Sequence, residues 1–187
     1  MSKARIESRG LHHVAYTTRD AEATYDFYTN KLGMPLLHTE INVQGDGFFR
    51  HFFFGMGNGE TIAFFEVNGV GEEADYKTDI STSLGLPQWT NHIAFKLDSL
   101  EALDARIEQL QQRGLDELLK LDHGWCTSVY LNDPNGIMVE FCVTTDEAKF
   151  LQTEQEALRL LRLPASEIGK GTRQQHSDAE RNQGPWN

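Results

Sequence analysis

The chain has only two cysteines, Cys126 and Cys142, among 187 residues, which is too few for a framework of disulfide bonds. It has no apolar run long enough to cross a membrane, and residues 1–7 lack the apolar core of a signal peptide. Basic residues are scarce as well, since the chain has 17 Lys and Arg but 28 Asp and Glu. The resulting net charge of −11 argues against nucleic acid and anionic membranes as partners. We therefore expect a cytoplasmic protein that binds neither.

The chain repeats one pattern at an offset of 79 residues, from His13 to His92. Each histidine opens a short alternating strand, and a helix-capping residue follows seven positions later, Asp20 in the first half and Ser99 in the second. Each half then predicts a helix and three strands. We expect two modules, at about residues 10–67 and 89–145, joined by an acidic, glycine-rich loop.

The C-terminal part of the chain departs from this repeat. Asp146 is a suitable N-cap for a helix that extends to about residue 163, where Pro164 ends it. Residues 165–187 are polar and have few apolar anchors. We expect one domain over residues 1–145, followed by a C-terminal helix and a polar tail over residues 146–187.

A hairpin near the end of the second module carries an acidic residue on an apolar strand. Its turn is Asp133-Pro134-Asn135-Gly136, a sequence that favours a tight turn, and Glu140 follows on the strand 137–143. A carboxylate on such a strand is costly to bury without a partner. His13 and His92, each on the less bulky face of its own strand, are candidate partners. Two histidines and one carboxylate form a metal-binding set that leaves coordination positions open.

This duplicated strand-helix-three-strand module, with a histidine opening each half and Asp-Pro-Asn-Gly-x-x-x-Glu closing the second, resembles the vicinal oxygen chelate superfamily over residues 10–145. The resemblance implies an α+β fold, in which two tandem βαβββ modules form a cupped, mostly antiparallel sheet with helices on its outer face. It also implies a homodimer and the metal ligands His13, His92 and Glu140. The superfamily includes glyoxalase I, extradiol ring-cleaving dioxygenases, epimerases and drug-binding resistance proteins, so fold alone does not decide function.

The hairpin is most similar to the signature of extradiol dioxygenases. That signature has a histidine, five to seven residues, an aliphatic-Tyr pair, Asp-Pro-x-Gly and a glutamate, which correspond here to His123, Val129-Tyr130, the turn and Glu140. The resemblance implies an enzyme of aromatic compound degradation that opens a catecholic ring with Fe(II) and O₂. Tyr130 would bond a substrate oxygen, and His123 would donate or shuttle a proton. His51 resembles the acid-base histidine of that class in strand position.

Two other functions remain open from the sequence. A glyoxalase I-like lyase or isomerase would use Zn(II), Ni(II) or Mn(II) and a fourth ligand, usually Glu, on the last strand of the first module. Aligning the two halves puts Phe64 at that position, where a phenyl ring cannot bind metal, so we place Phe64 with His51 in the substrate pocket. Glu66, two residues on, could be a shifted fourth ligand and is the only visible candidate for the general base that such an enzyme needs. A small-molecule binding protein without catalysis is the third hypothesis.

Overall fold

The computed structural model describes residue 8, residues 10–71 and residues 75–168. The chain divides into two compact units: the first ends at Leu86 and also includes Asn132–Ile137, whereas the second starts at Pro87 and resumes at Met138. The elements follow in this order: β1 (His13–Thr18), α1 (Ala21–Tyr25), η1 (Asp26–Lys31), β2 (Leu36–Gln44), β3 (Gly47–Gly55), β4 (Thr61–Asn68), α2 (Ile80–Ser83), η2 (Gln88–Thr90), β5 (His92–Lys96), α3 (Leu100–Gln112), β6 (Leu119–Asp122), β7 (Cys126–Asn132), β8 (Met138–Thr144), α4 (Glu147–Phe150), α5 (Glu154–Leu161) and η3 (Ala165–Glu167).

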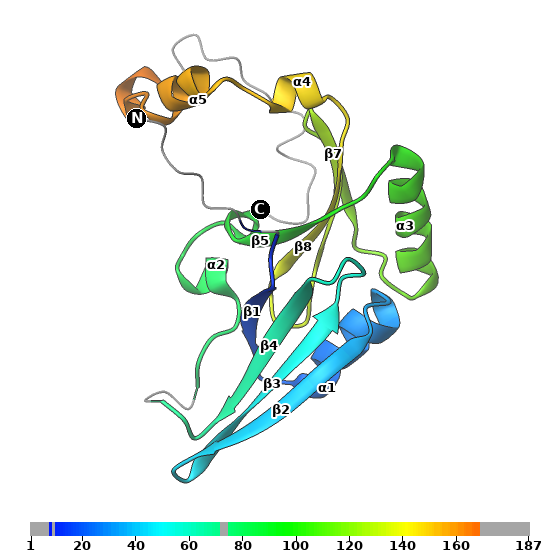
Figure 1. Cartoon of the computed structure of the whole chain (residues 1–187), viewed down its shortest axis with the longest axis vertical. Helices are drawn as coiled ribbons and strands as arrows, with labels where there is room; N and C mark the ends of the chain where they lie inside the picture. The colour runs from blue at the N-terminus through cyan, green and yellow to red at the C-terminus, as the bar shows by residue number, and fades with distance from the viewer. Residues whose placement is uncertain (1–7, 9, 72–74, 169–187) are drawn as a thin grey trace. The chain divides into compact units, whose positions relative to one another are not determined.

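The first unit contains a four-stranded sheet in the order β1-β4-β3-β2 (Figure 1). β1 lies parallel to β4, whereas β3 is antiparallel to both β4 and β2. Parallel strands need a long connection, and here the helix and two further strands supply it. One strand, one helical segment and three strands therefore form the first βαβββ module, as the sequence predicts.

The helical segment of this module starts at a side-chain cap and then widens. The carboxylate of Asp20 accepts a hydrogen bond from the N–H of Ala23 at 2.9 Å, which fixes the first turn. Across Asp26–Lys31 the segment is a π-helix, whose wider turn buries two successive aromatic side chains, Phe27 and Tyr28.

Tyr28 is at the centre of the first unit's core. Its ring stacks on Phe54 with centroids 5.3 Å apart and contacts Phe64 at 4.9 Å. Both phenylalanines are fully buried, on β3 and β4. One face of the first sheet therefore packs against the helical segment, which leaves its other face available for a site.

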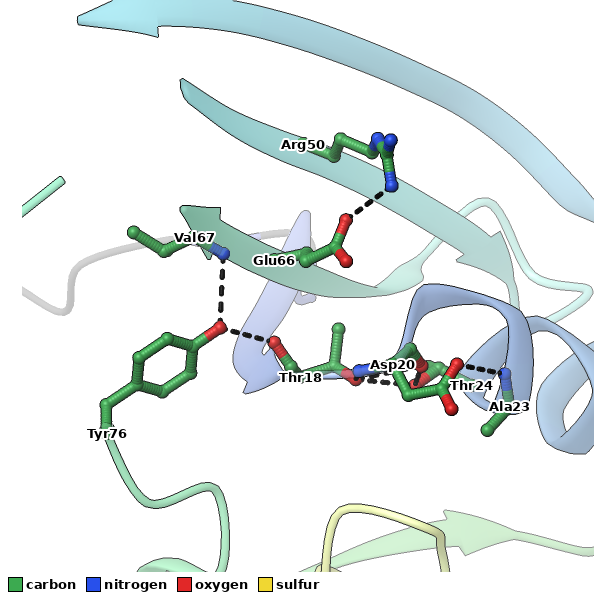
Figure 2. A network of polar contacts seen from close by, with 8 residues as sticks. All are labelled: Thr18, Asp20, Ala23, Thr24, Arg50, Glu66, Val67 and Tyr76. Atoms are coloured by element: carbon green, nitrogen blue, oxygen red, sulfur yellow. Dashed lines mark hydrogen bonds and ion pairs between the residues drawn. The ribbon is translucent and has the colours of Figure 1, made fainter. Parts of the chain in front are cut away.

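The hydroxyl of Tyr76 joins the ends of β1 and β4 (Figure 2). It donates to the carbonyl of Thr18 at 2.6 Å and accepts from the N–H of Val67 at 3.1 Å. The Thr18 hydroxyl lies 2.8 Å from that of Thr24, so the same strand end is also bonded to α1. These bonds satisfy backbone groups at the point where the two parallel strands stop.

The second unit repeats the module, with strand order β5-β8-β7-β6. β5 lies parallel to β8, and β6 is antiparallel to β7. The side chain of Ser99 caps α3 by accepting from the N–H of Ala102 at 3.2 Å, and the helix buries Leu103 and Leu110. Two open, mixed four-stranded sheets with their helices confirm the α+β class and the two βαβββ modules.

The turn between β7 and β8 belongs to the first unit and is built around Asp133. One carboxylate oxygen accepts from the N–H groups of Asn135 and Ile137, each at 2.8 Å. The other accepts from the hydroxyl of Tyr28 at 3.1 Å. Gly136 has φ of +79°, which only glycine adopts without strain, so the predicted turn has the residues that it needs.

The C-terminal helix predicted from Asp146 to about residue 163 is two helices, α4 and α5. Leu151 and Thr153 have extended backbone, and the Thr153 hydroxyl accepts from the N–H of Glu156 at 3.2 Å, which starts a new helix. The predicted polar tail lies mostly beyond residue 168, outside the described residues. Among the described helices, none combines the length and the apolar character that crossing a membrane requires.

Candidate functional site

One face of the second sheet carries the polar side chains that the sequence predicts for the site. β5 and β8 pair so that Ala94 lies beside Glu140. His92 is two residues before Ala94, so it points to the same face as Glu140. By the same alternation Ser128 and Tyr130 of β7 share one face, and the hydroxyl of Ser128 bonds the Glu140 carboxylate. The bulky residues between them are buried on the opposite side.

His92 and Glu140 face each other directly, with Nε2 of the imidazole 3.0 Å from Oε2 of the carboxylate. The other ring nitrogen, Nδ1, lies 2.9 Å from the carbonyl oxygen of Trp89. Because a carbonyl only accepts, Nδ1 carries the hydrogen, and a neutral His92 has its lone pair on Nε2. A lone pair and a carboxylate repel each other at this distance unless a proton or a metal cation lies between them. A backbone carbonyl on the remote nitrogen is also how proteins orient metal-binding histidines.

Glu140 is 5% exposed, and its carboxylate is fixed from its other side. Its Oε1 atom accepts a hydrogen bond from the hydroxyl of Ser128 at 2.5 Å. The thiol of Cys126 lies beyond, 3.9 Å from the Ser128 hydroxyl, and burial together with the neighbouring Cys142 raises the pKa of Cys126 to about 12. That thiol is therefore protonated and unreactive at neutral pH.

Tyr130 and His123 form a second polar pair on this unit. The Tyr130 hydroxyl lies 2.9 Å from Nε2 of His123. Burial and the nearby charge of Glu140 raise the pKa of Tyr130 well above its usual range. The hydroxyl therefore remains protonated at neutral pH and can act as a hydrogen-bond donor.

In the first unit, His13 lies at the start of β1 with a cluster of rings around it. Its Nδ1 atom is 2.8 Å from Nδ1 of His12, so one of these two atoms carries the shared hydrogen. The rings of Phe53 and His51 are 5.5 and 6.0 Å from the His13 ring, centroid to centroid. The carbonyl of His12 in turn accepts from the N–H of Thr61 at 3.2 Å, which anchors this histidine to β4.

His51 is buried on the same face of the first sheet. Its ring stacks on Phe65, with centroids 3.7 Å apart and planes 10° from parallel. Nδ1 lies 3.3 Å from a carboxylate oxygen of Glu40 on the neighbouring strand. Burial lowers the pKa of His51, and Glu40 partly offsets that effect. The imidazole is therefore neutral at physiological pH.

The strand pairing identifies the residue in the first half that corresponds to Glu140. In the second half, Ala94, two residues after His92, pairs with Glu140. In the first half, Ala15, two residues after His13, pairs with Ala63. Ala63 is thus the counterpart of Glu140, and the alignment that assigns this position to Phe64 is wrong by one residue.

That shift moves two predicted residues to the other face of the first sheet. Phe64 is fully buried in the core against Tyr28, which contradicts a pocket role beside His51. Glu66 is on the same face as Phe64 and accepts a hydrogen bond from Arg50 at 2.6 Å (Figure 2). Glu66 therefore points away from the face of His13 and cannot join it as a shifted fourth ligand.

The structure brings together two of the three predicted metal ligands, His92 and Glu140. His13 belongs to the first unit and the other two to the second. Within the described ranges, no group of three or more His, Cys, Asp or Glu side chains is arranged to hold a metal ion. The complete set of three ligands stays a prediction.

The polar partners of the predicted residues include two groups that the sequence analysis misses. A carbonyl such as that of Trp89 belongs to the backbone, so no residue type marks it. Glu40 follows strand alternation, but its contact with His51 depends on the register of β2 against β3. Hydrophobic patterning does not determine that register for a strand whose residues are all exposed.

Comparison with known proteins supports this fold and module order. Residues 10–141 match the family described as the Glyoxalase/Bleomycin resistance protein/Dioxygenase superfamily. A provisionally named ring-cleaving dioxygenase of Bacillus subtilis (strain 168), MhqE, is 36% identical over 70 residues, which are 36% of this chain and 23% of that protein. Biphenyl-2,3-diol 1,2-dioxygenase 2 of Rhodococcus globerulus is 37% identical over 62 residues, 31% of this chain and 33% of that protein. These matches therefore span only about a quarter and a third of the curated relatives.

A solved structure of a glyoxylase/bleomycin resistance protein/dioxygenase domain from Frankia sp. EAN1pec has the same fold. It superposes with a TM-score of 0.54 at 21% identity, over 74% of this chain and 99% of that one. At this level of identity the likeness establishes the fold and leaves the chemistry to the residues of the site.

Proposed function

This chain belongs to the Glyoxalase/Bleomycin resistance protein/Dioxygenase superfamily, and from that premise we propose that it is a metal-dependent, extradiol-type ring-cleaving dioxygenase. Its substrate would be a catechol-like aromatic diol, which reacts with O₂. The observation that carries the proposal is the pairing of His92 and Glu140, whose Nε2 and Oε2 atoms lie 3.0 Å apart with the imidazole hydrogen held on Nδ1. The names of the two dioxygenase relatives support it.

The residues at this position fit a divalent metal ion. Two ligand atoms at right angles, each about 2.1 Å from an ion, are about 3.0 Å apart. Nε2 of His92 and Oε2 of Glu140 are 3.0 Å apart. We propose that His13, His92 and Glu140 hold Fe(II), with the Trp89 carbonyl and the Ser128 hydroxyl orienting the latter two. Bound Fe(II) would supply the open coordination positions at which a diol and O₂ meet.

Ala63 favours a dioxygenase over a glyoxalase I-like lyase. A four-ligand site would need an acid on the last strand of the first module, but the counterpart of Glu140 there is Ala63, and Glu66 faces the other way. Two histidines and one carboxylate are the donor set of iron oxygenases with open positions.

Tyr130 and His123 would act on the substrate. The Tyr130 hydroxyl, which stays protonated because burial raises its pKa, is suited to donate a hydrogen bond to a substrate oxygen. His123, 2.9 Å from that hydroxyl, can hold it in place and exchange a proton with it.

Anaerobic loading of the full chain with Fe(II), followed by addition of catechol and air, tests the proposal. We expect consumption of O₂ together with the yellow absorbance of a ring-opened product. If the iron-loaded protein binds catechol but consumes no O₂, the dioxygenase proposal is wrong and a binding protein is favoured. If Zn(II) or Ni(II) activates an isomerase reaction instead, the lyase alternative holds. We further expect a homodimer, which light scattering measures directly.

A further inference from the structure

The loop that carries His123 is held by a segment of the chain that lies beyond the family match. Residues 10–141 match the superfamily, and α4 comes after them. The loop consists of residues 123–125, between β6 and β7, and belongs to the same unit as α4. The carbonyl of Trp125 in this loop accepts hydrogen bonds from the N–H groups of Thr145 and Asp146, at 2.8 and 3.0 Å, just before α4 begins.

Two side chains of α4 add further contacts with the same loop. The Phe150 ring stacks on the Trp125 ring, with centroids 4.8 Å apart and planes 22° from parallel. The ammonium group of Lys149 donates to the carbonyl of Gly124 at 3.2 Å. Aromatic stacking and a charge-assisted hydrogen bond are both attractive, so α4 restrains the loop through a side chain and through the backbone.

The loop needs such a restraint because it contains a glycine directly after His123. The N–H of His123 donates to the carbonyl of Cys126 at 2.8 Å, and the N–H of Gly124 donates to the carboxylate of Asp122 at 2.7 Å, which closes the turn. Gly124 has φ of +80°, and a glycine can leave that conformation easily. Contacts from outside the loop therefore determine how firmly His123 is held.

The position of this loop matters for the site through one hydrogen bond. Nε2 of His123 lies 2.9 Å from the hydroxyl of Tyr130. Hydrogen bonds of this kind are rare beyond about 3.2 Å and weaken when they are misaligned. A small displacement of the loop would therefore separate His123 from Tyr130.

We propose that Phe150 and Lys149 are positioning residues of the site, which hold the loop so that His123 stays within hydrogen-bond reach of Tyr130. The role of His123 in the reaction comes from the proposed function. The restraint on the loop concerns the second unit alone and needs no metal, so the two proposals can fail separately.

The test uses the metal-free full chain, labelled with ¹⁵N. The ¹⁵N shift of His123 Nε2 reports its hydrogen bond, and Tyr130→Phe supplies the reference value for a ring without that partner. We expect Phe150→Ala to move the shift at least halfway to this reference. Phe150→Trp keeps an aromatic ring on Trp125 and should restore the original shift. Lys149→Met keeps an apolar stem and loses the donor, so it should move the shift less far in the same direction.

A control and an activity measurement separate positioning from general stability. Leu161→Ala is the matched control, because it removes an 81% exposed apolar side chain from the next helix, and it should leave the His123 shift unchanged. In the iron-loaded chain we expect Phe150→Ala to lower kcat by about tenfold with unchanged iron content. It should have no further effect in a His123→Phe background, because it acts through His123.

Several results would overturn the inference. An unchanged His123 shift in a folded Phe150→Ala chain means that α4 does not position the loop. An equal change in Leu161→Ala means that any loss of stability has this effect, and failure of Phe150→Trp to restore the shift rejects the stacking. If Phe150→Ala does not fold, an unchanged shift in Lys149→Met contradicts the proposal. Absence of O₂ consumption together with the expected shifts would reject the oxygen chemistry and leave the positioning role in place.

Discussion

The hydroxyl of Tyr28 donates to the carboxylate of Asp133 at 3.1 Å, although 105 positions separate them in the sequence. The same carboxylate accepts from two backbone N–H groups of its own turn. Burial nevertheless raises the pKa of Asp133 above its ordinary value of 3.8, because these bonds lower the pKa by less than the loss of water raises it. The charged form of Asp133 therefore costs the native chain some stability.

We expect the variant Asp133→Asn to gain stability relative to the unmodified chain as pH rises. The folded-state pKa is the higher one, so the native chain keeps this proton to a higher pH than the unfolded chain does. The unmodified chain thus loses stability from about pH 3.8 up to the raised pKa and loses no more above it. Urea unfolding of both chains between about pH 4 and pH 7 measures the difference. If the difference in unfolding free energy between the two chains stays constant with pH, or increasingly favours the unmodified chain as pH rises, the pKa of Asp133 is not raised.

Replacing the proposed acidic ligand should remove the metal. We expect Glu140→Gln to weaken Fe(II) binding by about two orders of magnitude or more, since a neutral amide is a poor ligand in place of a carboxylate. Competition with a chromophoric chelator measures the affinity. Glu66→Gln is the matched control and should keep it, because Glu66 is on the other face of its sheet and bonds Arg50. Loss of iron in the control would restore the four-ligand alternative.

Removing one hydroxyl should separate catalysis from metal binding. Tyr130→Phe keeps the ring and removes the proposed donor, so we expect kcat to fall by about 10²-fold or more while iron content stays the same. Steady-state O₂ consumption and elemental analysis give the two quantities. If Tyr130→Phe also lost its iron, Tyr130 would be holding the site together and not acting on the substrate.

The bridge at the end of the parallel strands should contribute to stability. Tyr76→Phe leaves the carbonyl of Thr18 and the N–H of Val67 without their partner, and we expect it to cost about 1–2 kcal/mol of unfolding free energy. Urea denaturation measures the loss. Tyr25→Phe, on the exposed side of α1, should leave the midpoint unchanged. Equal effects of the two variants would mean that the bridge seen in Figure 2 contributes nothing.

The sequence predicts the modules well because their signals are local. Strand alternation and the caps at Asp20 and Ser99 involve neighbouring residues, and both caps form as expected. Pairings between distant strands are harder to predict. Aligning the halves by residue type predicts Phe64 as the counterpart of Glu140, whereas the strand register makes Ala63 the counterpart. A shift of one residue moves a side chain to the other face of its sheet.

Partners that lie outside the strand pattern are also beyond sequence reasoning. The carbonyl that bonds His92 comes from Trp89, in a short turn that no periodicity marks. The predicted helix breaks at Leu151 because two capping residues compete within it. Asp146 caps α4, and Thr153 caps a second helix, α5. Local preference alone does not choose between these outcomes.

Ala63 makes the two modules chemically unequal, because its counterpart in the second module is Glu140. The two modules have the same strand order, but in the proposed centre the first contributes only an imidazole, whereas the second contributes both an imidazole and the acid. Neither module can stand in for the other. A gene carrying the second module twice would encode two acids, so its product would hold an ion with four protein ligands and fewer free positions, whereas a gene carrying the first module twice would encode no acid at this position.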